Sequence, residues 1–323
     1  MGCQPCGYTW RMAASGSPAA PPSHANVHST VLVTGGTGVM GSVIANRLLA
    51  EGYVTRVYAR RATQAAVAPG IVPYDGDIRD VDKLAHALTG ADAVAHLVGI
   101  LRETGPGQTF DGVFREGARA VIQAARLAGV RHLVHVTGIG ADSTSPDAFE
   151  RTRGHAERET RESDLDWVIL RPSVLFGVRG SMFDRIAQSL RRTRPFAVVP
   201  RRDGLYQPLW RDDAAACVAA ALRESSVLGG TYELGGPDTW SYRELAQLAM
   251  RRLRLRRIVL PLPAPLLLAG ASLPRLVRKS ALITTSELRQ LTRDNRTDPE
   301  IMRSVFGVEP TSLTDKLDEA FVL

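Results

Sequence analysis

A glycine-rich segment at residues 34–41 follows directly on a short apolar run, and its residue types suit the binding of phosphate. A strand that ends in glycines and turns straight into a helix leaves the first N–H groups of that helix unsatisfied and pointing outward. Glycines also let a pyrophosphate approach the backbone without meeting a Cβ atom. The spacing fits G-x-x-G-x-x-G through Gly35, Gly38 and Gly41, and also G-x-G-x-x-G if Gly36 is counted first. Because an amphipathic helical pattern follows, the segment predicts a dinucleotide site, against the alternative of an ordinary glycine turn.

The residues at the end of the second predicted strand bear on which dinucleotide is bound. The strand ends in Ala59-Arg60-Arg61, and no acidic residue lies between Glu51 and Asp75. An acidic residue there would accept hydrogen bonds from the ribose 2′-OH of NAD, whereas an arginine accommodates the 2′-phosphate of NADP. The pattern favours NADP(H) over NAD(H). A solvated pair of arginines in an Arg-rich chain is the alternative.

The third predicted strand is followed by Gly76-Asp77-Ile78. A carboxylate at this place can accept a hydrogen bond from the adenine amino group, while Ile78 covers the ring. Asp77 can instead cap the helix that follows, and the two roles are compatible. Together with the glycine turn, the predicted cofactor-binding residues so far are Gly35, Thr37, Gly38, Val39, Met40, Gly41, Arg60, Arg61, Asp77 and Ile78.

Strand-like and helix-like segments alternate through the first half of the chain, which predicts a parallel sheet with crossover helices. The predicted strands are 30–34, 54–59, 71–75, 93–98, 132–137 and 167–171. The predicted helices between them are 39–51, 79–89, 110–129 and 147–163. Six strands in this alternation predict a doubly wound α/β sheet of the Rossmann type, with its ligand cleft at the carboxyl ends of the strands.

After about residue 172 the alternation breaks. Helices are predicted at 181–192, 211–224, 241–253 and 284–294, with an extended piece at 231–234. Two of these helices open with capping boxes, one from Ser241 to Glu244 and one from Thr284 to Glu287. We therefore expect a disordered leader at 1–29, a dinucleotide-binding domain at 30–177 and a smaller, mostly helical C-terminal lobe at 178–323 that is partly threaded into the sheet.

From about Val31 to about Thr311 the chain resembles the short-chain dehydrogenase/reductase superfamily in its extended and atypical branches. Particular phrases narrow the resemblance to the NAD(P)H-binding accessory subunit of respiratory complex I and its bacterial relatives. More distantly, the chain is similar to photosystem assembly factors and to nitrogen-metabolite-repression-like regulators. The phrases are His96-Leu97-Val98-Gly99-Ile100-Leu101, His135-Val136-Thr137-Gly138-Ile139-Gly140-Ala141-Asp142, Leu170-Arg171-Pro172-Ser173-Val174-Leu175-Phe176-Gly177 and Tyr232-Glu233-Leu234-Gly235-Gly236-Pro237.

The resemblance implies which positions carry the superfamily's chemistry, in which a Tyr and a Lys four residues later exchange a proton with the substrate. The matching positions are Phe149 and Arg153, with Thr137 at the place of the substrate-orienting hydroxyl. Phe149 has no ionisable proton, so the usual acid/base step cannot run through it. Arg153 can still bond the ribose hydroxyls in a different geometry. Further implied cofactor-binding residues are Leu97, Val98, Gly99, Thr137, Arg153, Pro172 and Val174.

No other residue is a convincing replacement for the missing proton donor. Tyr206 and Asp213 lie in a phrase that faces cofactor and substrate in the extended branch, where the Asp usually serves structure. His96 and His135 fall within predicted strands, where a buried, hydrogen-bonded imidazole is the expected role. For His155 a solvent-facing helix position is expected.

The positive charge of the chain is concentrated in its second half. Residues 1–150 carry 12 basic and 12 acidic residues, so the net charge of +7 arises from residues 151–323. Two arginine clusters lie at 191–202 and 251–257, and the second runs directly into a Pro-broken apolar stretch at 258–270. The combination suits an anionic membrane surface or a membrane-bound partner; a solvated helix face followed by a lobe-core segment explains it equally well. No nucleic-acid-binding pattern is present, and we expect no such partner.

The three cysteines exclude a disulfide framework, and Cys3 and Cys6 lack a second ligand pair, so we predict no metal site. A reducing, cytoplasmic setting fits, with peripheral attachment to a membrane as the open alternative. Two functions remain open. The first is an NADP(H)-holding structural or assembly subunit, or redox sensor, near a respiratory-type membrane complex. The second is an active NAD(P)H-dependent reductase, dehydratase or epimerase with a non-standard proton donor.

Overall fold

The computed structural model describes residues 29–201, 204–263, 265–267 and 291–321. The predicted leader lies outside the described residues except for Ser29. The predicted helix at 284–294 lies outside them up to residue 290, and so does the predicted capping box between Thr284 and Glu287.

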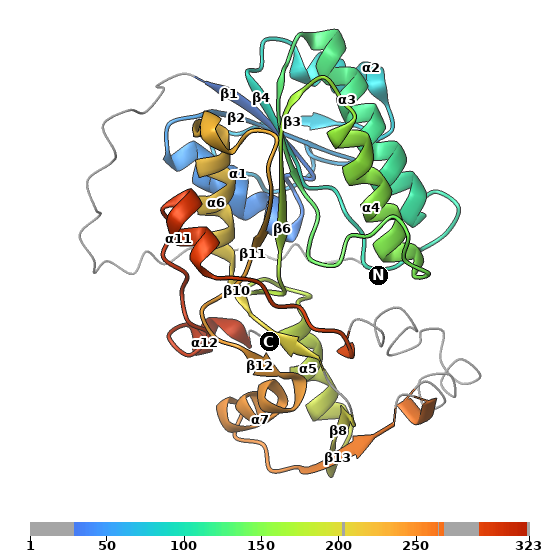
Figure 1. Ribbon diagram of the computed structural model, residues 1–323, viewed down its shortest axis with the longest axis vertical. Helices are drawn as coiled ribbons and strands as arrows, with labels where there is room; N and C mark the ends of the chain where they lie inside the picture. The colour runs from blue at the N-terminus through green and yellow to red at the C-terminus, as the bar shows by residue number, and fades with distance from the viewer. Residues whose placement is uncertain (1–28, 202–203, 264, 268–290, 322–323) are drawn as a thin grey trace.

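Seven parallel strands form the central sheet, in the order β11-β6-β5-β4-β1-β2-β3 (Figure 1). They are β1 (Thr30–Thr34), β2 (Val54–Ala59), β3 (Val72–Asp75), β4 (Ala93–His96), β5 (His132–Val136), β6 (Asp166–Pro172) and β11 (Thr231–Leu234). β1 and β4 are buried along their whole length, as expected of central strands in a sheet that is covered on both faces. Strand order reverses between β1 and β4, so the predicted doubly wound fold is confirmed.

Helices cover both faces of the sheet (Figure 1). On one face lie α1 (Val39–Ala50), α6 (Arg211–Arg223) and α11 (Glu300–Phe306). On the other lie α2 (Val81–Leu88), α3 (Gly117–Ala128) and α4 (Ala148–Arg161). The predicted helix at 110–129 opens with a π-helical segment, η1 (Asp111–Glu116), before α3, and it ends at Gly129, whose φ of 74° suits glycine.

All six predicted strands are present, and each begins and ends within two residues of its predicted bounds. The seventh strand, β11, comes from the predicted extended piece at 231–234 and pairs in parallel with β6. The chain therefore returns to the sheet after residue 177, first through α6 and then through β11. The predicted domain boundary at this residue stays a prediction.

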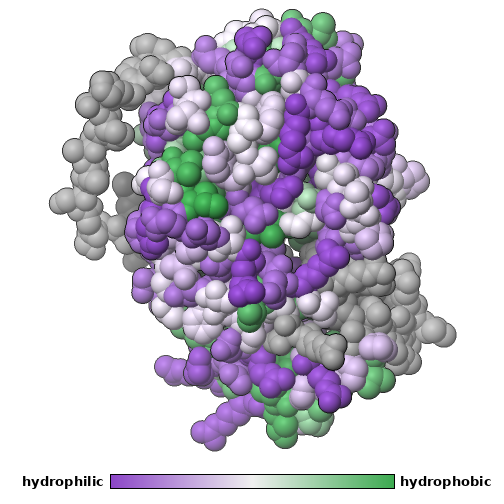
Figure 2. Space-filling model, viewed as in Figure 1, coloured by the Kyte–Doolittle hydropathy of each residue, from purple (hydrophilic) through white to green (hydrophobic). Residues whose placement is uncertain are grey.

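The C-terminal lobe has a hydrophobic core of its own, which includes Phe183, Ile186 and Leu245. Its elements are α5 (Met182–Arg192), β8 (Phe196–Pro200), α7 (Tyr242–Arg252), β13 (Ile258–Leu262) and α12 (Leu317–Ala320). The short elements around them are β7 (Leu175–Phe176), β9 (Leu205–Tyr206), β10 (Leu209–Trp210), η2 (Ser225–Val227) and β12 (Trp240–Ser241). The predicted capping box of Ser241 and Glu244 is confirmed at the start of α7. Apolar surface shows at the lower tip of the visible face, where β8 and β13 lie (Figure 2).

Two histidines face each other inside the sheet, because His96 on β4 and His135 on β5 are register partners. Their ring centroids are 4.8 Å apart, and both side chains are buried. Each Nδ1 atom pairs with a threonine hydroxyl, that of Thr34 for His96 at 2.7 Å and that of Thr160 for His135 at 2.8 Å. Burial lowers the pKa of His135 to about 3 and holds the pKa of His96 well below its usual range. Both imidazoles are therefore neutral in the folded protein.

We expect this pair to make the fold acid-sensitive below about pH 6.5, the pKa of a histidine in the unfolded chain. The folded pKa values are depressed, so the unfolded state binds protons first and stability falls as pH drops from about 6.5 towards 3. Each imidazole contributes up to about 1.4 kcal/mol per pH unit. Urea unfolding between pH 7.5 and 4.5 measures the slope. The variant His86→Gln removes an exposed histidine and should leave this slope unchanged. An unfolding free energy that does not fall with pH in the native chain would contradict the role given to His96 and His135.

Candidate functional site

A cleft of about 1460 Å³ lies at the carboxyl ends of the central strands, between the sheet and the C-terminal lobe. The residues that follow β1, β2, β3, β4 and β5, and the last residue of β6, all line it, as the doubly wound topology requires. Every cofactor-binding and catalytic residue predicted from the sequence lines this one cleft. They are Gly35, Thr37, Gly38, Val39, Met40, Gly41, Arg60, Arg61, Asp77, Ile78, Leu97, Val98, Gly99, Thr137, Phe149, Arg153, Pro172 and Val174.

The glycine corner between β1 and α1 is shaped to receive a phosphate group. α1 begins after Gly38, which has no side chain to cap the helix, so its first N–H groups open toward the cleft. A Cβ atom on Gly41 would collide with the carbonyl oxygen of Gly35, and a Cβ on Gly36 would collide with the side chain of Val57. Only glycines allow this close approach of helix and strand. The residues present therefore fit a dinucleotide pyrophosphate.

The part of the cleft beside the ends of β2 and β3 carries Arg60, Arg61 and the Asp77–Arg79 ion pair. Asp77 receives two hydrogen bonds from the Arg79 guanidinium, at 2.8 and 3.0 Å, and this partner lowers the pKa of the Asp77 carboxyl. The alternative role of Asp77 as a helix cap is wrong: α2 begins one turn later, and Asp80 accepts the capping bond. Arg60 and Arg61 are exposed at the rim of the cleft.

Phe149 and Arg153 stack on each other along α4. The guanidinium carbon of Arg153 lies 4.3 Å from the centre of the Phe149 ring, and both side chains are buried. The ring also packs edge-on against Phe110 and Phe114, with centroids 5.3 and 5.6 Å away. Burial lowers the pKa of Arg153 to about 10, and its Nε has no partner among the described residues. A buried cation with an unsatisfied donor fits a ligand hydroxyl or anion in the cleft.

The hydroxyl of Thr137 donates a 2.7 Å hydrogen bond to the fully buried carboxylate of Glu157. Arg171 holds the same carboxylate with two bonds of 2.9 and 2.6 Å, and Arg161 adds one of 2.6 Å. The bond to Glu157 also raises the pKa of Arg171. We did not predict Glu157 from the sequence. The available signal was its place one turn after Arg153 on a predicted helix.

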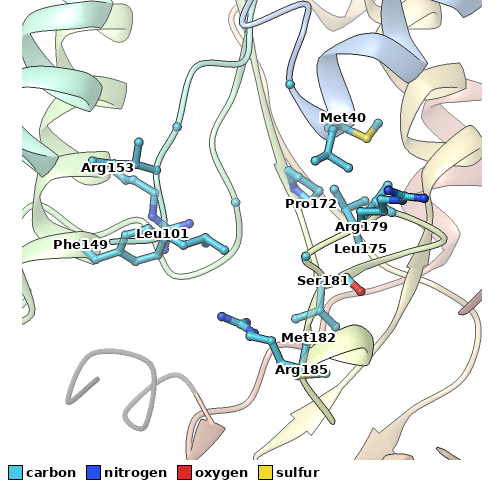
Figure 3. A pocket seen from close by; sticks show the side chains of 18 of the residues that line it. Met40, Leu101, Phe149, Arg153, Pro172, Leu175, Arg179, Ser181, Met182 and Arg185 are labelled. Atoms are coloured by element: carbon cyan, nitrogen blue, oxygen red, sulfur yellow. The ribbon is translucent and has the colours of Figure 1, made fainter. Parts of the chain in front are cut away.

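Figure 3 shows how the two walls of the cleft face each other. Phe149, Arg153 and Leu101 stand on one side, and Met182 and Arg185 of the lobe stand on the other. The lobe residues that line the cleft were also missed in the sequence, because only the packing of α5 decides which of its faces turns inward. They include Ser181, Met182, Arg185, Gln188, Ser189 and Arg192.

The alternative proton donors fall in different places. Tyr206 is buried and lines the cleft. Asp213 accepts hydrogen bonds from the backbone and hydroxyl of Thr311, so it connects α6 to the C-terminal segment. His155 is partly exposed on α4 and does not line the cleft. Tyr242, which we did not predict, lines the cleft with a pKa raised by burial to about 12.

The fold and the cleft define a Rossmann-type dinucleotide-binding protein. The family model described as NAD(P)H-binding matches residues 35–203, and the chain belongs to this family, within the atypical branch of the short-chain dehydrogenase/reductase superfamily. The chain is 24% identical over 293 residues to the mitochondrial NADH-ubiquinone oxidoreductase 40 kDa subunit of Neurospora crassa. The aligned region covers 88% of this chain and 77% of the relative. It is 31% identical over 219 residues to the NAD(P)H azoreductase of Xenophilus azovorans, covering 67% and 71%.

A solved structure supports the fold. The Bordetella bronchiseptica enzyme WbmG, in a structure with NAD, matches with a TM-score of 0.69 and 18% identity, over 93% of this chain and 96% of that one. No helix among the described residues is long and apolar enough to cross a membrane. The same residues contain no group of three His, Cys, Asp or Glu side chains arranged to hold a metal ion.

The Glu157 network gives a prediction about stability. The variant Glu157→Gln leaves two arginines without their buried counter-charge, and we expect it to lower the free energy of unfolding by about 3–5 kcal/mol. The matched control is Glu159→Gln, two residues along the same helix, where the pair with Arg119 lies at the surface and is worth at most about 1 kcal/mol. Urea denaturation measures both; equal effects would show that the network contributes no more than a surface pair.

Proposed function

We propose that the chain holds NADP(H) in this cleft without using the superfamily's Tyr mechanism, and serves as a structural or assembly subunit, or as a redox sensor, beside a membrane complex. One observation carries the proposal: neither the proton donor nor the substrate-orienting hydroxyl of the superfamily is available. Phe149 has no proton to give and packs against two other phenylalanines. The Thr137 hydroxyl donates its proton to Glu157 and so has none left for a substrate oxygen.

The roles proposed for the chain's residues follow from their places. The N–H groups after Gly38 would hold the pyrophosphate, and Arg60 and Arg61 would hold the 2′-phosphate. Arg153 would donate to the ribose hydroxyls through its unsatisfied edge. When bound, the nicotinamide supplies a hydride. Bound cofactor would also stabilise the fold by linkage, so the NADPH level could set the amount of competent protein.

The membrane setting rests on two supports. A relative that is 24% identical to this chain, in an alignment that covers 88% of the chain, is named as a subunit of NADH-ubiquinone oxidoreductase. The lobe also presents exposed apolar side chains, Phe196 and Ile258, next to exposed arginines such as Arg191 and Arg194. Cations beside apolar surface suit an anionic membrane surface or a membrane-bound partner.

The second candidate is an active reductase, dehydratase or epimerase. The relative with 31% identity is named an azoreductase, and Tyr206 lies in the cleft with its own phenol. Hydride transfer needs correct placement of the nicotinamide, and water or Tyr206 would supply the proton.

Cofactor preference is tested with the double variant Arg60→Gln/Arg61→Gln. Removing both cations should weaken NADPH binding at least about tenfold, because charge-assisted bonds to the 2′-phosphate are lost, and should leave NADH binding unchanged. Isothermal titration calorimetry measures both affinities. Arg126→Gln, at a surface pair with Asp164 far from the cleft lining, is the matched control. Equal loss for the two coenzymes would argue against a 2′-phosphate site.

Turnover separates the two candidate functions. Purified protein is incubated with NADPH and a panel of carbonyl and quinone acceptors while absorbance at the nicotinamide band is followed. The first function predicts retained NADPH without steady oxidation, both in the native chain and in Tyr206→Phe. Steady oxidation that Tyr206→Phe lowers at least about tenfold would instead establish the reductase with Tyr206 as its proton donor.

A further inference from the structure

The cleft extends beyond the residues assigned to the dinucleotide. Its volume of about 1460 Å³ exceeds the roughly 300–1,000 Å³ of most ligand sites. The additional space lies toward the lobe, where α5, β8, β13 and residues 266–267 complete the lining. We call this part the outer half of the cleft, and it is lined by Leu101, Met182, Arg185, Gln188, Arg192, Val198, Leu262, Leu266 and Leu267.

One wall of the outer half is basic. Arg185 and Arg192 lie seven residues apart, two turns along α5, so they share the face that also brings Ser181, Gln188 and Ser189 to the cleft. Arg185 is half-buried and extends from α5 into the open space (Figure 3). Asp184 is the one acidic residue of α5. Its side chain is buried and accepts a 2.7 Å hydrogen bond from the backbone N–H of Gly180. Two of the side chains that α5 contributes to the cleft lining are therefore cationic.

A second part of the lining is apolar. In the β8–β13 pair, Val198 is the register partner of Leu260 and Pro200 that of Leu262, so one face of this ribbon carries only apolar side chains. Val198, Pro200 and Leu262 from this face line the cleft, and Leu266 and Leu267 continue the same surface. Leu266 is 57% exposed, so its side chain is accessible to a ligand.

We propose that the outer half of the cleft binds an amphiphile with one acidic headgroup, a phosphate or a carboxylate, and an unbranched apolar chain. The headgroup lies against Arg185 and Arg192, and the chain lies along Leu262, Leu266 and Leu267. This inference rests on the proposed function, because it assumes that the dinucleotide occupies the other half. Arginines and apolar side chains both line this half of the cleft, so neither a free anion nor a neutral hydrocarbon satisfies both.

The test uses the full chain saturated with NADPH and the probe dodecyl phosphate, kept below its critical micelle concentration. Calorimetry should show binding without release of NADPH. Octyl and decyl phosphate should bind more weakly. The affinity should fall by up to about fourfold for each methylene group that is removed from contact with the apolar side chains. Dodecyl carboxylate should bind comparably, whereas inorganic phosphate and dodecanol should each bind at least about a hundredfold more weakly.

Matched variants locate the binding site. Arg185→Gln should weaken dodecyl phosphate binding about tenfold, whereas Arg126→Gln, at a surface pair with Asp164 outside the cleft lining, should not. Leu262→Asn should weaken it by a similar factor, whereas Leu127→Asn, 65% exposed on α3 and outside the lining, should not. An unchanged NADPH affinity shows that each variant is folded.

The outcomes are distinct for the two proposals. If NADPH binds and dodecyl phosphate does not, or if inorganic phosphate binds as tightly, the amphiphile site is refuted and the proposed function stands. Displacement of NADPH by the probe, or equal losses in the Arg126 and Leu127 controls, also refutes it. If the folded chain fails to bind NADPH, the proposed function itself is wrong.

Discussion

The buried carboxylate of Glu157 is the point on which the geometry of the cleft depends. It lies on α4 and accepts bonds from Thr137 after β5, from Arg171 on β6 and from Arg161 on its own helix. Arg171 continues the network to Glu233 on β11 at 3.3 Å. A buried charge is tolerated only when it is paired and hydrogen-bonded, so these elements must keep one relative position. The helix that carries Phe149 and Arg153 is thereby fixed against the strand ends that line the cleft.

That fixed frame explains why two chemically different halves can share one cleft. In the half beside the sheet, the polar groups include backbone N–H groups, because the glycines leave those at the start of α1 uncapped by a side chain. The half beside the lobe is shaped by side chains from α5 and from the β8–β13 pair. Sheet strands hold the first half in position, while the second depends on a separate hydrophobic core that includes Phe183 and Leu245. Changes in lobe side chains can therefore alter ligand choice without disturbing the nucleotide end.

Local patterns were enough for the sheet and for the nucleotide end of the cleft. Apolar runs and glycines identified the strands and the corner at Gly38, because each of these features is determined by neighbours in sequence. Asp77 and Asp80 both precede α2, and only the observed start of the helix showed that Asp80 is the cap. The role of Glu157 was out of reach, because its partner Arg171 approaches only when β6 is paired. The inward face of α5 depends likewise on packing within the lobe.

The return of the chain to the sheet through β11 has a consequence for how the protein can be divided. β11 forms the outer edge beside β6, and α6 covers that side of the sheet with Ala214, Ala215 and Val218. A fragment that stopped at residue 177 would leave the backbone groups of β6 unpaired and its apolar face in water. Such an edge recruits strands from other molecules and favours aggregation. Limited proteolysis within the lobe would accordingly yield nicked chains that stay associated, and the two segments would have to be co-expressed to recover a nucleotide-binding unit.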